Sequence, residues 1–342
     1  MTDIAIGHIS TPFVSVYPWS AGFGTKYANP GILPAGTGYG VTFSLSGADI
    51  AVSHATSPFV SAYPWSAGFG TKYADPGTLP GGGCRHVDFS PSGADIAVAH
   101  TATPFVSAYP WSAGFGSKYT NPVTLPVGDG RGVAFSPSGA DIAIAEIGIP
   151  FLIAYPWSAG FGTKYTDPAT SASTYGRGVA FSPNGNDIVY AHSTTPFVSA
   201  FPWSAGFGTK YANPGTLPAG TGYGVVFSAS GTDVAVSHAV SPWVSVYPWS
   251  SGFGTKYANP GTLPTGYGRG IGFSRSGTDI AIAHFVSTFV SAYPWSSGFG
   301  TKYANPGILP GGNGQSIEFS RDTGSTPGPS GVGVYNDTTY YF

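Results

Sequence analysis

The dipeptide Pro-Trp recurs along this chain at a constant interval of 46 residues. Its tryptophans are Trp19, Trp65, Trp111, Trp157, Trp203, Trp249 and Trp295. Because the interval never changes, no unit carries an insertion or a deletion, and every copy must have the same loop lengths. Seven equal units fit a closed ring better than an open stack, since the end units of a stack need different outer faces.

Within each unit, short runs of β-forming residues alternate with turns. In the second copy we expect strands over Gly40–Ser44, Asp49–His54, Pro58–Ser66 and Phe69–Pro76. In the second and third strands, the side chains on both faces are mostly apolar or small, so each sheet needs a neighbouring sheet on both sides. A parallel β-helix is the alternative, but its repeats are shorter. The sequence therefore predicts an all-β fold, a seven-bladed β-propeller of four-stranded antiparallel blades, in residues 1–322.

The two chain ends predict how the ring closes. Met1 aligns with Gly47, so the chain begins inside the turn between the first and second strands of a unit. The last unit ends after its first strand, Ile317–Ser320. We therefore expect a 3+1 closure, in which the C-terminal first strand completes the N-terminal second, third and fourth strands.

Composition excludes several classes of protein. The chain has 52 Gly and 31 Pro, which argues against helices, and it is 42% hydrophobic, which argues against disorder. A net charge of −2 argues against binding to nucleic acid or anionic lipid, which basic proteins favour. The N-terminus resembles neither a signal peptide nor a membrane anchor. Cys84 is the single cysteine, and no catalytic motif is present. We expect no enzyme activity, no cofactor and no metal.

Two resemblances are carried by the repeat. The run FSPSGADIAVAH, followed by PFVSAYPW, resembles the WD-repeat pattern over residues 1–322, but Ser follows the Trp where that family has Asp. The family's Asp-His-Ser/Thr-Trp network is therefore not carried over. The run YPWSxGFGTKYANPxTLPxGxGxGVAFSPSG is similar to propeller repeats of tailed-bacteriophage virion proteins. This second resemblance implies a virion component in a tail, fibre or capsid decoration, assembled in the host cytoplasm without a signal peptide.

Positions that are fixed in all seven units indicate the scaffold. We expect the tryptophans to form the core. The lysines of the fourth strand should protect the blade edge; they are Lys26, Lys72, Lys118, Lys164, Lys210, Lys256 and Lys302. The aspartates that open the second strand should cap the preceding turn; they are Asp3, Asp49, Asp95, Asp141, Asp187, Asp233 and Asp279.

Varying positions indicate a candidate binding face. The second strand ends in His8, His54, His100, Glu146, His192, His238 and His284, and the position before the first strand holds Tyr39, Arg85, Arg131, Arg177, Tyr223, Arg269 and Gln315. These positions lie at the same end of an antiparallel pair, so we expect both at the channel mouth. The candidate binding residues are Arg85, Arg131, Arg177, Arg269, Tyr39, Tyr223, His54, His100 and Glu146. An anionic or glycan ligand is one interpretation; a solvated rim, with each His satisfied by the next loop, is the other.

Residues 323–342 lie outside the repeat and divide into a Gly/Pro/Ser linker and an aromatic arm. The arm carries Tyr335, Tyr340, Tyr341 and Phe342, which we expect to dock on a neighbouring subunit or another virion protein; a hairpin folding back on the propeller is the alternative. The leading interpretation is a non-enzymatic structural or interaction protein. A lectin-like propeller that binds a host-surface glycan is the alternative, and an enzyme is the weakest reading because the copies look uniform.

Overall fold

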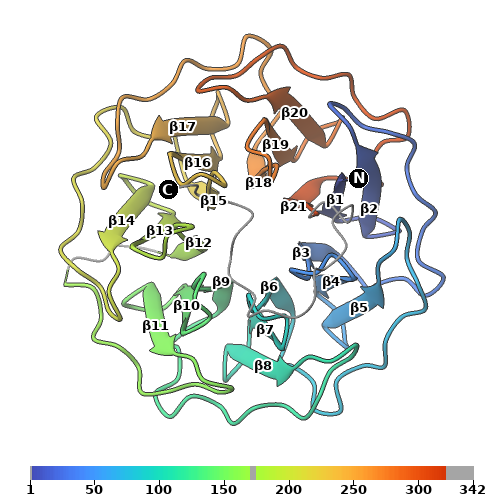
Figure 1. Cartoon of the computed structure of the whole chain (residues 1–342), viewed down its shortest axis with the longest axis vertical. Coiled ribbons are helices and arrows are strands. Elements are labelled where there is room, and N and C mark those ends of the chain that lie inside the picture. The colour runs from blue at the N-terminus through green and yellow to red at the C-terminus, as the bar shows by residue number, and fades with distance from the viewer. Residues whose placement is uncertain (1, 170–174, 321–342) are drawn as a thin grey trace, which may run out of the picture.

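The fold is a ring of seven antiparallel sheets around a central opening (Figure 1). The computed structural model describes residues 2–169 and 175–320, and within these ranges there is no helix. The prediction of an all-β, seven-bladed propeller is confirmed.

Each sheet has three regular strands. The blade that contains both chain ends is built from β1 (Thr2–His8), β2 (Val14–Trp19) and β21 (Gly314–Phe319). The next three blades are β3 (Gly38–Phe43), β4 (Asp49–His54) and β5 (Val60–Pro64); β6 (Cys84–Phe89), β7 (Asp95–His100) and β8 (Val106–Pro110); and β9 (Gly130–Phe135), β10 (Asp141–Glu146) and β11 (Leu152–Pro156). The last three are β12 (Gly176–Phe181), β13 (Asp187–His192) and β14 (Val198–Pro202); β15 (Gly222–Phe227), β16 (Asp233–His238) and β17 (Val244–Pro248); and β18 (Gly268–Phe273), β19 (Asp279–His284) and β20 (Val290–Pro294).

The first strand of every unit lies innermost. Figure 1 shows β21, β3, β6, β9, β12, β15 and β18 around the central opening, with the third strands farther out. The channel wall is therefore made from seven short segments that are equivalent in the repeat.

The ring closes through the two ends of the described chain. Strand β21 pairs antiparallel with β1, with Ile4 opposite Phe319 and Ile6 opposite Ile317. The backbone N–H of Asp3 also donates to Ser320 Oγ at 2.7 Å. This pairing is the predicted closure, in which the C-terminal strand completes the N-terminal blade.

The expected fourth strand differs from the prediction. The segment after Trp19 meets the third strand in one isolated bridge, Trp19 with Phe23, and by a bond from the Tyr27 N–H to the Val16 carbonyl at 2.9 Å. Its Gly and Pro residues disfavour a continuous ladder. In this outer segment Lys72 forms an ion pair with Asp75, three residues farther on.

The core lies between neighbouring blades. In one cluster, Val87 and Phe89 of β6 pack with Ala51 and Val60 of the preceding blade. The tryptophans are buried at these boundaries, as predicted; Trp65 meets Tyr27 of the preceding unit edge-on, with ring centroids 5.2 Å apart.

The fixed aspartates join blades, which corrects their expected role as turn caps. Asp3 accepts hydrogen bonds from the Tyr27 hydroxyl at 2.8 Å and from Trp65 Nε1 at 2.9 Å. Tyr27 belongs to the same unit as Asp3, whereas Trp65 belongs to the next one. The same pair of bonds recurs at the other six aspartates. A carboxylate has enough acceptor sites for both donors, which explains why this position does not vary.

Candidate functional site

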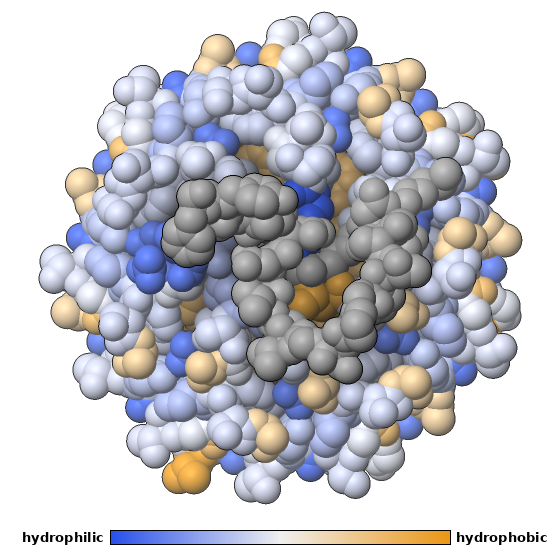
Figure 2. Space-filling model, in the orientation of Figure 1, coloured by the Kyte–Doolittle hydropathy of each residue, from blue (hydrophilic) through white to orange (hydrophobic). Residues whose placement is uncertain are grey.

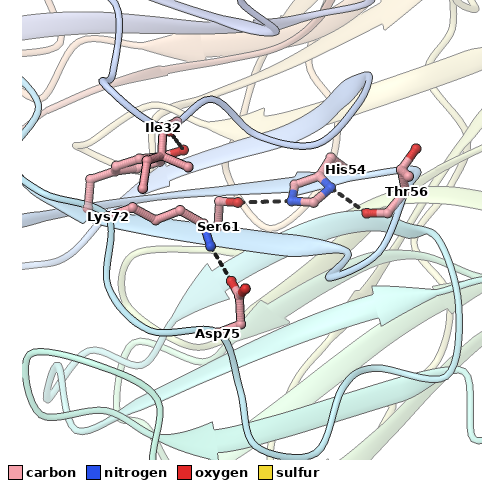
Figure 3. Close-up of polar contacts among 7 residues, drawn as sticks. Ile32, His54, Thr56, Ser61, Lys72 and Asp75 are labelled. Atoms are coloured by element: carbon pink, nitrogen blue, oxygen red, sulfur yellow. Dashed lines mark hydrogen bonds and ion pairs between the residues drawn. The ribbon is translucent and has the colours of Figure 1, made fainter.

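The histidines at the ends of the second strands are buried and have structural partners. His54 donates from Nδ1 to the Thr56 carbonyl at 2.7 Å, and Nε2 accepts from the Ser61 hydroxyl at 3.0 Å (Figure 3). Burial lowers the pKa of His54 to about 4, so the ring is neutral at pH 7. His100 is buried in the same way, beside Ser107. The expectation that these histidines face the channel mouth is therefore wrong, because they are enclosed by the next turn and the third strand.

Glu146 occupies the histidine position of one blade and is also fully buried. It accepts hydrogen bonds from the backbone N–H groups of Val127 at 2.6 Å and Gly128 at 2.8 Å. Burial raises its pKa to about 7. In the same blade Ile153 replaces the serine that pairs with histidine elsewhere, so both partners changed together. Glu146 holds a loop and does not belong to the mouth surface.

The four arginines do gather around the channel. Arg85, Arg131, Arg177 and Arg269 each occupy the second position of an inner strand and line one cavity of about 530 Å³. In Figure 2 hydrophilic and hydrophobic residues lie together in the visible part of the central opening. We name the end of the cavity that these four arginines line the arginine mouth.

Tyrosine rings contact three of the four guanidinium groups. Arg85 lies over the ring of Tyr39, 4.2 Å from its centroid. Tyr223 contacts two arginines, with Arg177 at 4.8 Å and Arg269 at 4.2 Å from its centroid. Such contacts leave guanidinium N–H groups free to bind a ligand. Tyr39 and Tyr223 thus lie beside three of the arginines, and ligand binding at these residues stays a prediction.

The arginine mouth concentrates positive charge. Burial and the neighbouring Arg85 lower the pKa of Arg131, and Asp129 offsets this with an ion pair at 3.1 Å. The pKa of Arg177 is also lowered, first by burial and also by the charges of Arg131 and Arg269. Guanidinium groups stay charged under all ordinary conditions, so their mutual repulsion favours binding of an anion.

Unsatisfied donors support the same conclusion. Among the residues that the structure describes, the Nε atoms of Arg85, Arg131 and Arg269 are buried without a hydrogen-bond partner. Buried donors are normally paired, so this mouth has capacity for an oxygen-rich ligand.

Sequence reasoning missed a second group of residues deeper in the channel wall. His86 and Asp88 lie two positions apart on β6, where the other inner strands carry mostly Gly, Ala or another small residue. His86 donates from Nδ1 to the Val133 carbonyl at 3.0 Å, which leaves Nε2 as an acceptor; burial lowers its pKa to about 4. Asp88 accepts from the backbone N–H of Phe135 at 2.9 Å, and burial raises its pKa to about 7.

Glu318 on β21 occupies the position equivalent to Asp88. Its pKa is raised to about 8, first by burial and then by the charge of Asp88. Strand β3 lies between β21 and β6 in the ring (Figure 1). Its Thr42 hydrogen-bonds the Glu318 carboxyl. Both carboxyls line the channel cavity, and they also line an adjoining space of about 80 Å³. The signal was available in the sequence: CRHVDF and GQSIEF break the GRGVAF pattern of the first strand.

No group of three or more His, Cys, Asp or Glu side chains within residues 2–169 and 175–320 could hold a metal ion. In the same ranges no helix is long and apolar enough to cross a membrane. The residues of the expected docking arm, Tyr335, Tyr340, Tyr341 and Phe342, lie outside the described residues. Their docking role, the expected partners and the expected location therefore stay predictions.

Comparison with known proteins finds likeness in structure alone. No protein-family model and no curated protein sequence matches the chain. The fold is similar to that of a candidate 6-phosphogluconolactonase from Bacteroides uniformis, with a TM-score of 0.69 and 16% identity over 93% of this chain and 99% of that chain. The periplasmic gluconolactonase of Pseudomonas aeruginosa matches with a TM-score of 0.70 and 14% identity, over 94% of this chain and 99% of that chain. Hydrazine synthase from Kuenenia stuttgartiensis matches with a TM-score of 0.59 and 17% identity, over 75% of this chain and 76% of that chain.

These likenesses correct the expected function. Two of the neighbours that match over nearly their whole length are named as lactonases, which contradicts the expectation of a non-enzymatic virion scaffold with a lectin-like module as its alternative. None of the three structures is named as a WD-repeat or virion protein. At these identities the comparisons establish the propeller fold. The uniformity that argued against an enzyme also fails at His86, Asp88 and Glu318.

Proposed function

We propose that this chain is a hydrolase that opens anionic lactones inside the propeller channel. The observation that carries the proposal is the combination, in one cavity of about 530 Å³, of four arginines at the mouth and the carboxyl pair Asp88 and Glu318 in the wall. The names of the structural neighbours support lactones as the substrate class.

The arginine mouth holds the anionic group of the substrate. Arg85 and Asp88 are three positions apart on β6, which corresponds to roughly 10 Å along the strand. A small lactone with an anionic group at one end can therefore contact the arginines while its ring carbonyl lies near the carboxyl pair.

The carboxyl pair supplies the proton transfers. The Asp88 carboxylate accepts a proton from a water molecule, and the resulting hydroxide oxygen bonds to the lactone carbonyl carbon. Glu318, whose pKa of about 8 keeps it protonated at pH 7, donates its proton to the ring oxygen as the ring carbon–oxygen bond breaks. The product is an open-chain hydroxy acid. Nε2 of His86 accepts a hydrogen bond from a substrate hydroxyl, which orients the lactone ring.

The test measures acid release from glucono-δ-lactone and its 6-phosphate in a pH-stat. Asp88→Ala reproduces the residue that Ala134 and Ala180 supply in other blades, so the fold should tolerate it. We expect kcat to fall by about 100-fold or more, because general-base catalysis contributes that much. Arg85→Tyr, which copies Tyr39, should raise KM for the phosphorylated lactone far more than it lowers kcat.

The pH profile of kcat/KM gives a second readout. We expect a bell shape, rising as Asp88 loses its proton near pH 7 and falling as Glu318 loses its own near pH 8. Asn121→Ala on the outer rim is the control and should keep the wild-type rate. Hydrolysis no faster than the uncatalysed reaction, or full activity in Asp88→Ala, would refute the proposal.

A further inference from the structure

One sector beside the arginine mouth is aromatic and exposed. Tyr267, Phe285 and Val286 are 51%, 37% and 49% exposed. The rings of Tyr267 and Phe285 have centroids 6.2 Å apart with an interplanar angle of 32°. The backbone N–H of Phe285 donates to the Tyr267 carbonyl at 3.1 Å, which ties the two loops together. We call these three residues the aromatic ledge.

The repeat shows that the fold does not require the aromatic ledge. The positions equivalent to Tyr267 hold Thr37, Gly83, Asp129, Tyr175, Thr221 and Asn313, and those equivalent to Phe285 hold Ile9, Ala55, Thr101, Ile147, Ser193 and Ala239. A blade with threonine and alanine at these positions forms the same strands. Exposed aromatic area costs free energy in water, so a packing requirement does not explain the ledge.

The aromatic ledge is continuous with the arginine mouth through Arg269. The guanidinium of Arg269 lies 5.6 Å from the Phe285 ring centroid and 4.2 Å from the Tyr223 ring centroid. Its Nε is buried without a partner in the part of the chain that the structure describes. A cation with unused donors therefore adjoins an exposed aromatic surface.

We propose that the aromatic ledge is a specificity subsite for ligands that carry an aromatic or other flat apolar ring next to their anionic group. The anion binds Arg269 and its neighbours, and the ring packs against Phe285 and Tyr267. A bare polyol would gain little from this surface, whereas a flat ring gains both apolar burial and aromatic contact. The proposal deepens the proposed function, since it rests on an anion binding at the arginine mouth, and it adds the chemistry of the adjoining substituent.

The test compares phenyl phosphate with inorganic phosphate, which differ by one aromatic ring. Titration calorimetry on the full chain should give a Kd for phenyl phosphate at least about 10-fold lower, equivalent to about 1.4 kcal/mol. In the variant with Tyr267→Thr and Phe285→Ala, which copies residues from other blades, the ratio of the two Kd values should approach one. Arg269→Tyr should weaken both ligands.

The matched control is Ile9→Ala, since Ile9 occupies the Phe285 position of the first blade and is equally exposed at 37%. It should keep the wild-type ratio. Equal binding of the two ligands by the wild-type chain would overturn the ledge proposal, even if lactones are hydrolysed. Tighter binding of phenyl phosphate without any lactone hydrolysis would instead refute the proposed function and leave the ledge standing.

Discussion

At the scale of single residues, the histidine position that suggested a binding face is buried and forms structural hydrogen bonds. His54 is enclosed by Thr56 and Ser61, and its neutral form satisfies both partners. The equivalent histidines His8, His100, His192, His238 and His284 are also fully buried, with pKa values lowered to about 4 by burial. A repeated buried base makes the whole ring sensitive to acid.

We predict that the free energy of unfolding falls as the pH drops from 6.5 towards 4. In this window the unfolded chain protonates its histidines and the folded chain does not, so unfolding takes up protons and acid favours it. The raised pKa values of Asp88, Glu146 and Glu318 act in the opposite direction, but they are three groups against the six histidines and His86. Urea denaturation at several pH values measures the effect.

His54→Gln provides the matched variant for this prediction. It removes one titrating ring, so the slope of unfolding free energy against pH should decrease by up to about 1.4 kcal/mol per pH unit. A wild-type stability that stays level between pH 6.5 and 4.5 would contradict the assignment of neutral buried histidines.

At the scale of elements, the regular features of the chain were predicted, and the exceptions to them were missed. The constant interval and the alternating apolar residues predicted blades, core and closure, because period and burial fix a repeat fold. The bonds of Asp3 were not predictable, since its partners Tyr27 and Trp65 come from two different units. The carboxyl pair was not predicted because Asp88 and Glu318 stand on β6 and β21, two strands far apart in the sequence that only the closed ring brings to one cavity.

We predict a strong energetic coupling between neighbouring blades through the aspartate–tryptophan bond. Asp49→Ala leaves the buried donors Trp111 Nε1 and Tyr73 Oη without their acceptor, which should cost about 2–5 kcal/mol of stability. A double-mutant cycle with Trp111→Phe, measured by chemical denaturation, should give a coupling energy of about 1 kcal/mol or more.

The exposed pair Lys118 and Asn121 offers the comparison for that cycle. A solvent-exposed polar pair of this kind should couple by less than about 1 kcal/mol. Additive effects of Asp49→Ala and Trp111→Phe would mean that the recurring bond contributes nothing to blade association.

At the scale of the whole molecule, closure converts seven weak sheets into one cooperative unit. Each three-stranded blade buries both faces only against its neighbours, so an open ring exposes two apolar faces. Strand β21 completes the closure, since it belongs to the last unit in sequence and to the first blade in space. The same strand carries Glu318, so the proposed chemistry also depends on closure.

We predict that a chain ending at Asn313 loses cooperative unfolding, whereas a chain ending at Ser320 keeps it. The shorter chain lacks the β1–β21 pairing and the packing of Ile317 and Phe319 against Ile4 and Ile6. Its first blade then exposes this apolar surface, so calorimetry should show a lower and broader transition, and urea unfolding should show a smaller dependence on denaturant. The chain that ends at Ser320 retains the bonds from Asp3 N–H to Ser320 Oγ and from Ser320 N–H to the Asp3 carbonyl, and it should melt as sharply as the full chain. Adding a synthetic peptide of residues 314–320 to the shorter chain should restore part of the transition, because the missing strand acts by pairing and needs no covalent link. An identical melting curve for the two truncated chains would mean that the ring does not depend on its last strand.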